Sequence, residues 1–102
     1  EENDIEEYKV HANALKDQAN DAFKSGDIQG AITLFTQAID LDPDNHVFYS
    51  NRAAAYMKAD SKSKALKDAE KCVELAPTWV KGYNRLGAAQ QSLKRFDAAI
   101  DT

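Results

Sequence analysis

The sequence repeats with a period of 34 residues, and this period constrains the fold more than any other feature. Pro43 and Pro77 lie 34 residues apart, in the segments LDPDN and LAPTW. The same shift aligns Leu15 with Tyr49 and Tyr83, Ala19 with Ala53 and Gly87, and Ala31 with Ala65 and Ala99. Small residues recur where two helices approach closely, so each unit is predicted to be a pair of helices with a proline at its exit.

Apolar residues recur at helical spacing inside the units, as Ile28, Ile32 and Phe35 do. Residues 25–27, Ser-Gly-Asp, have the glycine that ends one helix and the polar residue that starts the next. The same corner of the second unit, residues 58–61, has no glycine, so its boundary is less sharply marked. No alternating pattern predicts strands. The sequence therefore predicts an all-α protein with helices at residues 6–24, 28–41, 46–59, 62–75, 79–93 and from 96 onward.

The composition fits one small globular domain in a reducing compartment. Hydrophobic residues make up 43% of the 102 residues and charged residues 29%, which allows a modest apolar core. The single cysteine, Cys72, excludes an intrachain disulfide, and with the distant His11 and His46 it does not make a zinc site. No apolar run reaches the roughly 18 residues of a membrane span. We expect a cytoplasmic protein without cofactors, and its first residue, Glu rather than Met, suggests a longer parent chain.

Charge is unevenly distributed along this chain, whose formal net charge is −4. Residues 1–7 contain five acids and no base, and we expect them to be solvated and frayed. Residues 78–96 contain four bases and no acid. Two of these bases, Lys81 and Arg85, lie four apart, so they share one face of a helix and repel each other by a few tenths of a kcal/mol. Two cations without a local carboxylate favour a site for an anion.

The 34-residue helix–turn–helix unit is similar to the tetratricopeptide repeat, and the chain resembles that family over almost its whole length. The small, aromatic and proline positions of the family correspond to Ala19, Ala31, Phe35, Ala38 and Pro43, then Ala53, Tyr56, Ala65 and Pro77, then Gly87 and Ala99. The resemblance implies a right-handed α-solenoid of antiparallel helix pairs. Its expected parts are an acidic N-terminal extension at residues 1–11 and repeats at residues 12–45, 46–79 and 80–102, the third incomplete.

The chain departs from the family pattern in three places. Leu15 replaces the tryptophan of the family, and Lys62 stands where the second unit usually has an aromatic residue. The third unit stops at Thr102, early in its second helix, without the usual capping helix. We expect a monomer with a partly uncovered apolar edge, and dimerisation through that edge is the alternative. The edge would consist of Leu93, Phe96 and Ile100.

In such a solenoid the first helices of successive units line a concave groove, which is the usual binding surface. When the units are numbered from residues 12, 46 and 80, five polar residues occupy positions 2, 5, 6 and 9, which form one stripe along a helix. They are Lys16, Asn20, Asn51, Lys81 and Arg85. Three cations and two amides suit a ligand with two neighbouring carboxylates, as at a chain end whose last residue is Asp or Glu.

The segments LKDQANDAF, YSNRAAAY and TWVKGYNRLG closely resemble the two-carboxylate clamp of chaperone-binding tetratricopeptide domains. This resemblance implies that the five stripe residues bind the C-terminal Glu-Glu-Val-Asp of heat-shock protein 70 or heat-shock protein 90. NHVFYSNRAAAY and WVKGYNR are most similar to the first such domain of the heat-shock organising (stress-inducible) co-chaperones. LKDQANDAF also resembles the tetratricopeptide-containing protein phosphatase. An immunophilin and a general protein–protein scaffold are further alternatives.

Residues around the stripe are expected to support the site or the core. Five of them are candidates for auxiliary contacts, including a pocket for an apolar ligand residue: Phe23, Ala54, Met57, Lys58 and Asn84. Phe23 and Met57 are equally compatible with a place in the core. We expect Arg52 to point away from the groove and cover the interface between repeats. We expect Cys72 to lie in the core, and Trp79 and Tyr83 to pack between repeats.

The sequence lacks the motifs of an enzyme or a nucleic-acid-binding protein. It has no Ser–His–Asp or Cys–His arrangement and no glycine-rich phosphate loop. Asp68 and Glu70 lie two apart and so face different ways on a helix. Residues 62–74 mix Lys with Asp and Glu in a pattern typical of a solvated face, which does not favour a partner there. A net negative charge argues against general nucleic-acid binding. The sequence therefore predicts a non-catalytic adaptor.

Overall fold

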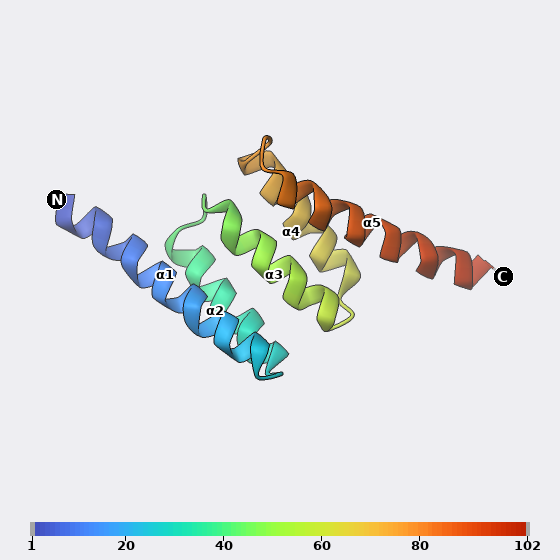
Figure 1. Cartoon of the computed structure of the whole chain (residues 1–102), viewed down its shortest axis with the longest axis horizontal. Helices are drawn as coiled ribbons and strands as arrows, with labels where there is room; N and C mark the ends of the chain where they lie inside the picture. Colours follow the sequence, from blue (N-terminus) through green and yellow to red (C-terminus); the bar gives the residue numbers. More distant parts are fainter. Residues whose placement is uncertain (1, 102) are drawn as a thin grey trace.

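The chain folds into helices that pack in successive antiparallel pairs. The computed structural model describes the backbone of residues 2–101 and the side chains of residues 7–94. Its helices are α1 (Glu2–Lys24), α2 (Ile28–Leu41), α3 (His46–Lys58), α4 (Lys62–Leu75) and α5 (Val80–Asp101). In Figure 1, α1 pairs with α2, α3 pairs with α4, and α5 packs against the second pair. No strand occurs within residues 2–101, so the predicted all-α class and helix-pair arrangement are confirmed.

The two corners between paired helices turn through left-handed backbone conformations. At the first corner Gly26 has a φ of 93°, which a glycine adopts without steric cost. Asp27 then caps α2, because its Oδ1 accepts a hydrogen bond of 3.0 Å from the Gly30 amide. At the second corner, which has no glycine, Asp60 adopts a φ of 63°. Aspartate tolerates this region better than most residues, so the corner forms without the expected glycine signal.

The 34-residue period reappears as a repeated hydrogen bond. The Tyr49 hydroxyl donates to the Pro43 carbonyl over 2.8 Å, and the Tyr83 hydroxyl donates to the Pro77 carbonyl over the same distance. Each bond ties the first turn of a helix to the exit of the preceding unit. Tyr83 is 47% exposed, and its hydrogen bond to Pro77 joins the third unit to the second.

The core consists of two clusters in which alanines let neighbouring helices approach closely. The first comprises Ala12, Ala38, Ile39, Phe48, Tyr49 and Cys72, and the second comprises Ala19, Ala31, Phe35 and Ala55. Trp79 packs against the first cluster and meets the His46 ring edge-on, with 4.7 Å between ring centroids. The predicted core position of Cys72 is therefore confirmed, and Trp79 packs, partly buried, against a cluster with residues of both the first and the second unit. Gly87, the third-unit equivalent of buried Ala19, is exposed.

An ion pair between α3 and α4 also forms a hydrogen bond to α2 and so links the two helix pairs. Arg52 of α3 donates from Nε and Nη2 to both carboxylate oxygens of Asp68 on α4, over 2.7 and 2.8 Å. Its Nη1 donates to the Thr36 hydroxyl of α2 over 3.1 Å. The prediction that Arg52 covers the repeat interface is confirmed. The prediction that residues 62–74 form a fully solvated face is wrong at Asp68, which is only 5% exposed because Arg52 holds it in the interface.

The ends of the helical array differ from the prediction. α1 begins at Glu2 rather than at residue 6, and the acidic run contains no glycine or proline to prevent this. α5 continues without a break to Asp101, so the separate helix predicted from residue 96 is wrong. Residues 91–96 contain neither glycine nor proline, and the strong helix formers around residues 93–95 continue the helix.

The C-terminal edge is described only in part. The C-terminal part of α5 extends past the first residues of α4 (Figure 1), and Leu93 is half-buried there, beside Lys62 and Ser63. The side chains of Phe96 and Ile100, which complete the predicted apolar edge, lie outside the described residues. Across the part of the chain that the structure describes, no helix combines the length and the apolar character needed to cross a membrane.

Candidate binding groove

All five residues of the predicted stripe line one open groove. The groove has a volume of about 420 Å³ and lies between α1, α3 and α5. The residues that line it are Lys16, Asn20, Phe23, Lys24, Phe35, Val47, Asn51, Ala54, Lys81 and Arg85. The helix pairs thus bring together residues that are as much as 69 positions apart in the sequence, from Lys16 to Arg85.

Helix starts fix where the groove residues point. The Asn45 side chain caps α3 by accepting a hydrogen bond of 3.0 Å from the Val47 amide. This start places Val47 and Asn51 one turn apart, and both line the groove. α5 begins at Val80, and its first two turns present Lys81 and Arg85.

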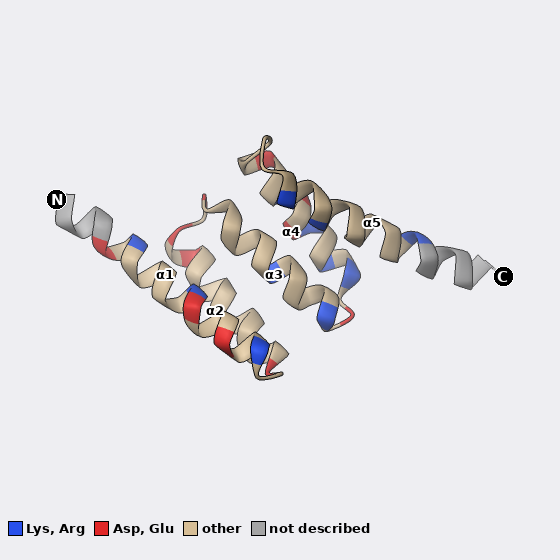
Figure 2. Cartoon of the chain, in the orientation of Figure 1, with Lys and Arg blue, Asp and Glu red and all other residues tan. Residues whose placement is uncertain are grey.

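The groove is positively charged although the whole chain is acidic. Four cations and no acidic side chain are among the residues that line it, and Figure 2 shows the basic residues of α1 and of the first part of α5. Lys16 contacts Asp17 at 3.4 Å, but Asp17 is 72% exposed and points outside the lining, so the pair is weak. Among the described side chains Lys81 has no ion-pair partner. An anionic ligand would therefore meet donors with no competing carboxylate among the described residues that line the groove.

Sequence reasoning missed three residues of the groove wall: Lys24, Phe35 and Val47. A signal for Lys24 was available, because it lies four residues after Asn20 and eight after Lys16, on the same helical face. Phe35 shows no such signal, because it belongs to a second helix and reaches the groove from beneath.

An apolar pocket of about 350 Å³ adjoins the groove. It shares Phe23, Ala54 and Arg85 with the groove, so the two form one continuous surface. The residues that line it are Phe23, Ala53, Ala54, Met57, Lys58, Arg85 and Ala88. Four of the five predicted auxiliary residues are therefore brought together. Asn84 is exposed and lines neither cavity.

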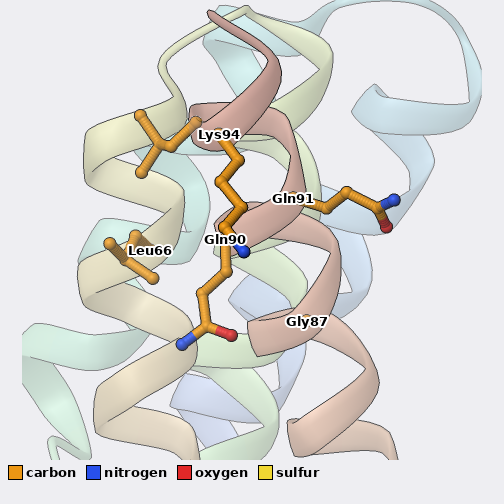
Figure 3. Close-up of a pocket in the computed structure, with 6 residues that line it drawn as sticks. Leu66, Gly87, Gln90, Gln91 and Lys94 are labelled. Carbon is orange, nitrogen blue, oxygen red and sulfur yellow. The ribbon is translucent and has the colours of Figure 1, made fainter. Parts of the chain in front are cut away.

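A third cavity, of about 580 Å³, lies between α4 and the second half of α5. Figure 3 shows Leu66 of α4 opposite Gln90 and Lys94 of α5. This cavity is larger than the groove, but among the described residues that line it Lys94 is the only one with a charge. Its chemistry offers one cation and two amides on an apolar floor, whereas the groove concentrates four cations. The groove is therefore the stronger candidate for recognition of an anion.

The arrangement of the groove suits two carboxylates held at once. Lysine provides a compact charge, arginine a planar pair of donors, and asparagine a neutral donor that also accepts. Charge-assisted hydrogen bonds of this kind contribute roughly 1.5–3 kcal/mol each. Donors from three helices surround the same space, so one short acidic peptide can contact all of them.

Comparisons with known proteins agree with this geometry. The family described as "TPR repeat" matches residues 19–60, and "Tetratricopeptide repeat" matches residues 47–78. The heat shock protein sti1 homolog of Schizosaccharomyces pombe is 51% identical over 88 residues, which are 86% of this chain and 15% of that protein. Human serine/threonine-protein phosphatase 5 is 43% identical over 89 residues, which are 87% of this chain and 18% of the phosphatase. The chain thus spans less than a fifth of these curated relatives.

The chain is also similar in fold and sequence to solved structures of TPR domains. The first TPR of Spaghetti (RPAP3) bound to the HSP90 peptide SRMEEVD is 36% identical, with a TM-score of 0.80, and the match covers 84% of this chain and 68% of that one. The TPR2B-domain:pHsp70-complex of yeast Sti1 is 30% identical, with a TM-score of 0.81, and the match covers 90% and 74% of the two chains.

Proposed function

Because the chain belongs to the tetratricopeptide repeat family, we propose that it is a non-catalytic adaptor that captures the C-terminal carboxylates of a cytosolic heat-shock chaperone. The ligand is a free chain end of the Glu-Glu-Val-Asp type, from heat-shock protein 70 or heat-shock protein 90. One observation supports this most: the five predicted clamp residues line one groove, and no acidic side chain is among the described residues that line it.

The last residue of such a ligand has two carboxylates, one on its side chain and one at its chain end. Lys16, Lys81 and Arg85 supply the opposite charges, and Asn20 and Asn51 donate without adding charge. The repulsion between Lys81 and Arg85 is relieved when an anion lies between them. In this proposal the chaperone peptide supplies the carboxylate that lies between Lys81 and Arg85.

The apolar pocket beside the groove would bind a residue further from the end of the ligand. In the HSP90 peptide SRMEEVD of one similar structure, methionine precedes the acidic pair, and in the HSP70 peptide SGPTIEEVD of another, isoleucine does. A pocket lined by Phe23, Ala54 and Met57 accepts either side chain by burying apolar surface. Differences between the two chaperones in affinity would therefore arise mainly here.

A second candidate concerns the parent protein rather than the groove. The chain is 43% identical to part of human serine/threonine-protein phosphatase 5, so the same groove could direct a catalytic domain to a chaperone. The higher identity to the sti1 homolog, 51%, favours a co-chaperone parent.

Alanine substitutions in α5 test the proposal. Lys81→Ala and Arg85→Ala should each weaken binding of a peptide ending in Glu-Glu-Val-Asp at least about tenfold, which corresponds to about 1.4 kcal/mol. Lys67→Ala, at an exposed position of α4, is the matched control and should leave the affinity unchanged. Isothermal titration calorimetry measures the three dissociation constants. Equal affinities for all three variants would place the binding surface elsewhere.

A further inference from the structure

Ser50 is a fully buried serine directly before the groove residue Asn51. Its side chain is 0% exposed, and its Oγ lies 3.4 Å from the Arg85 Nε, which donates to it. Within residues 7–94, this is the hydrogen bond that the structure gives to the Ser50 hydroxyl. A buried hydroxyl requires a partner, so α3 offers Arg85 a fixed acceptor on the inner side of the groove.

α5, the helix that carries Arg85, packs closely against α4 at Gly82. Gly82 lies three residues before Arg85, and a Cβ at Gly82 would lie 3.2 Å from the Cys72 Sγ and 3.5 Å from the Val73 Cγ2. The absence of a side chain therefore lets the two helices approach. Burial raises the pKa of the Cys72 thiol, and the positive charge of Arg85 opposes the rise. The guanidinium itself lies within hydrogen-bond distance of Ser50.

We infer that Ser50 is a positioning residue, which holds the Arg85 guanidinium through Nε so that both Nη groups face the carboxylate of the ligand. Arginine has five N–H donors, one on Nε and four on the two Nη atoms. When Nε bonds Ser50, the plane of the guanidinium is fixed and the pair of Nη donors remains for a carboxylate. Holding the side chain in its binding orientation reduces the entropy lost on association. This inference rests on the proposed function.

The test compares Ser50→Ala with two references. Alanine is smaller than serine and favours helix, so the variant should fold with little change in melting temperature. Ser63→Ala, at an exposed position of α4, is the matched control. Ser50→Ala should bind the Glu-Glu-Val-Asp peptide about three- to tenfold more weakly, because one long hydrogen bond is lost. Ser63→Ala should bind it as the unchanged protein does.

A double-mutant comparison separates positioning from a general structural effect. In the Arg85→Ala background, Ser50→Ala should cause no further loss, because the group that it positions is gone. NMR signals of the Arg85 Nε–H supply a second measurement, and their exchange with water should be several-fold faster in Ser50→Ala. Unchanged affinity in Ser50→Ala, or an equal loss in both backgrounds, would overturn the inference.

The carboxylate clamp and the contact between Ser50 and Arg85 can be tested independently of each other. If the unchanged protein bound the free-acid peptide and its C-terminal amide equally well, the carboxylate clamp would be refuted. The exchange rate of the Arg85 Nε–H would then still decide whether Ser50 holds the guanidinium. Faster exchange in Ser50→Ala supports that contact, and an unchanged rate overturns it.

Discussion

Removing Arg52 should destabilise the protein strongly, because it leaves a buried carboxylate without its partner. Arg52 donates two hydrogen bonds to Asp68 and one to Thr36, and so links three helices. The Asp68 side chain is 6% exposed and that of Arg52 17%. Its guanidinium also lies 5.5 Å from the centroid of the Tyr56 ring. In Arg52→Ala, Asp68 loses both hydrogen bonds and the opposite charge.

The size of the effect follows from this burial. Removing one partner of a buried ion pair costs about 3–5 kcal/mol, whereas a domain of this size is stable by about 5–15 kcal/mol in total. Each kcal/mol shifts the melting temperature of a small domain by about 4–8 °C. Arg52→Ala should therefore melt at least about 12 °C below the unchanged protein.

Thermal and urea unfolding followed by circular dichroism measure this loss, with two controls. Lys71→Ala removes an exposed ion pair, in which Lys71 is 41% and Glu74 70% exposed, and should cost less than about 1 kcal/mol. The double variant Arg52→Met with Asp68→Leu removes both charges and should be more stable than Arg52→Ala. The reasoning would be refuted if Arg52→Ala and Lys71→Ala melted at similar temperatures.

Two further predictions concern the hydroxyls of Tyr49 and Tyr83, which occupy equivalent positions of the repeat, and the buried thiol of Cys72. Tyr49→Phe should cost about 1 kcal/mol and Tyr83→Phe clearly less, because both hydroxyls donate over 2.8 Å but Tyr49 is 8% and Tyr83 47% exposed; urea unfolding that gave equal losses would contradict this. Burial raises the pKa of the Cys72 thiol from its ordinary 9.0, so the unfolded thiol ionises first and the free energy of unfolding falls as the pH rises above about 9. In Cys72→Ala that part of the fall should disappear between pH 8 and pH 10, and identical pH dependence in both proteins would count against it.

The helix pairs and the groove were largely predictable because the repeat relates distant residues. A period of 34 residues places Asn51 and Arg85 on equivalent helices, so their convergence with Lys16 required no knowledge of side-chain contacts. Small residues and prolines at matching positions fixed the corners and the exits. Hydrogen bonds from Tyr49 and Tyr83 to the preceding prolines give a physical reason for that spacing.

Features that depend on contact with one particular side chain of another helix were not predictable. Asp68 reads as one more charge in a mixed run, and only the position of Arg52 on the neighbouring helix explains its burial. Likewise, no local signal marks Ser50, because its hydroxyl faces Arg85, which lies 35 residues away. The prediction for the third unit failed for another reason. The repeat pattern predicts a corner near residue 94, but no glycine or proline interrupts the helix there, and α5 continues to Asp101.

The central claim is that the groove recognises a free terminal carboxylate, and one comparison tests it most directly. Isothermal titration calorimetry should be run on the unchanged protein with a peptide ending in Glu-Glu-Val-Asp and with the same peptide amidated at its C-terminus. The free acid should bind at least about tenfold more tightly, and its affinity should fall as salt is added, because the contacts are charged and partly exposed. Equal affinity for the acid and the amide would contradict the account.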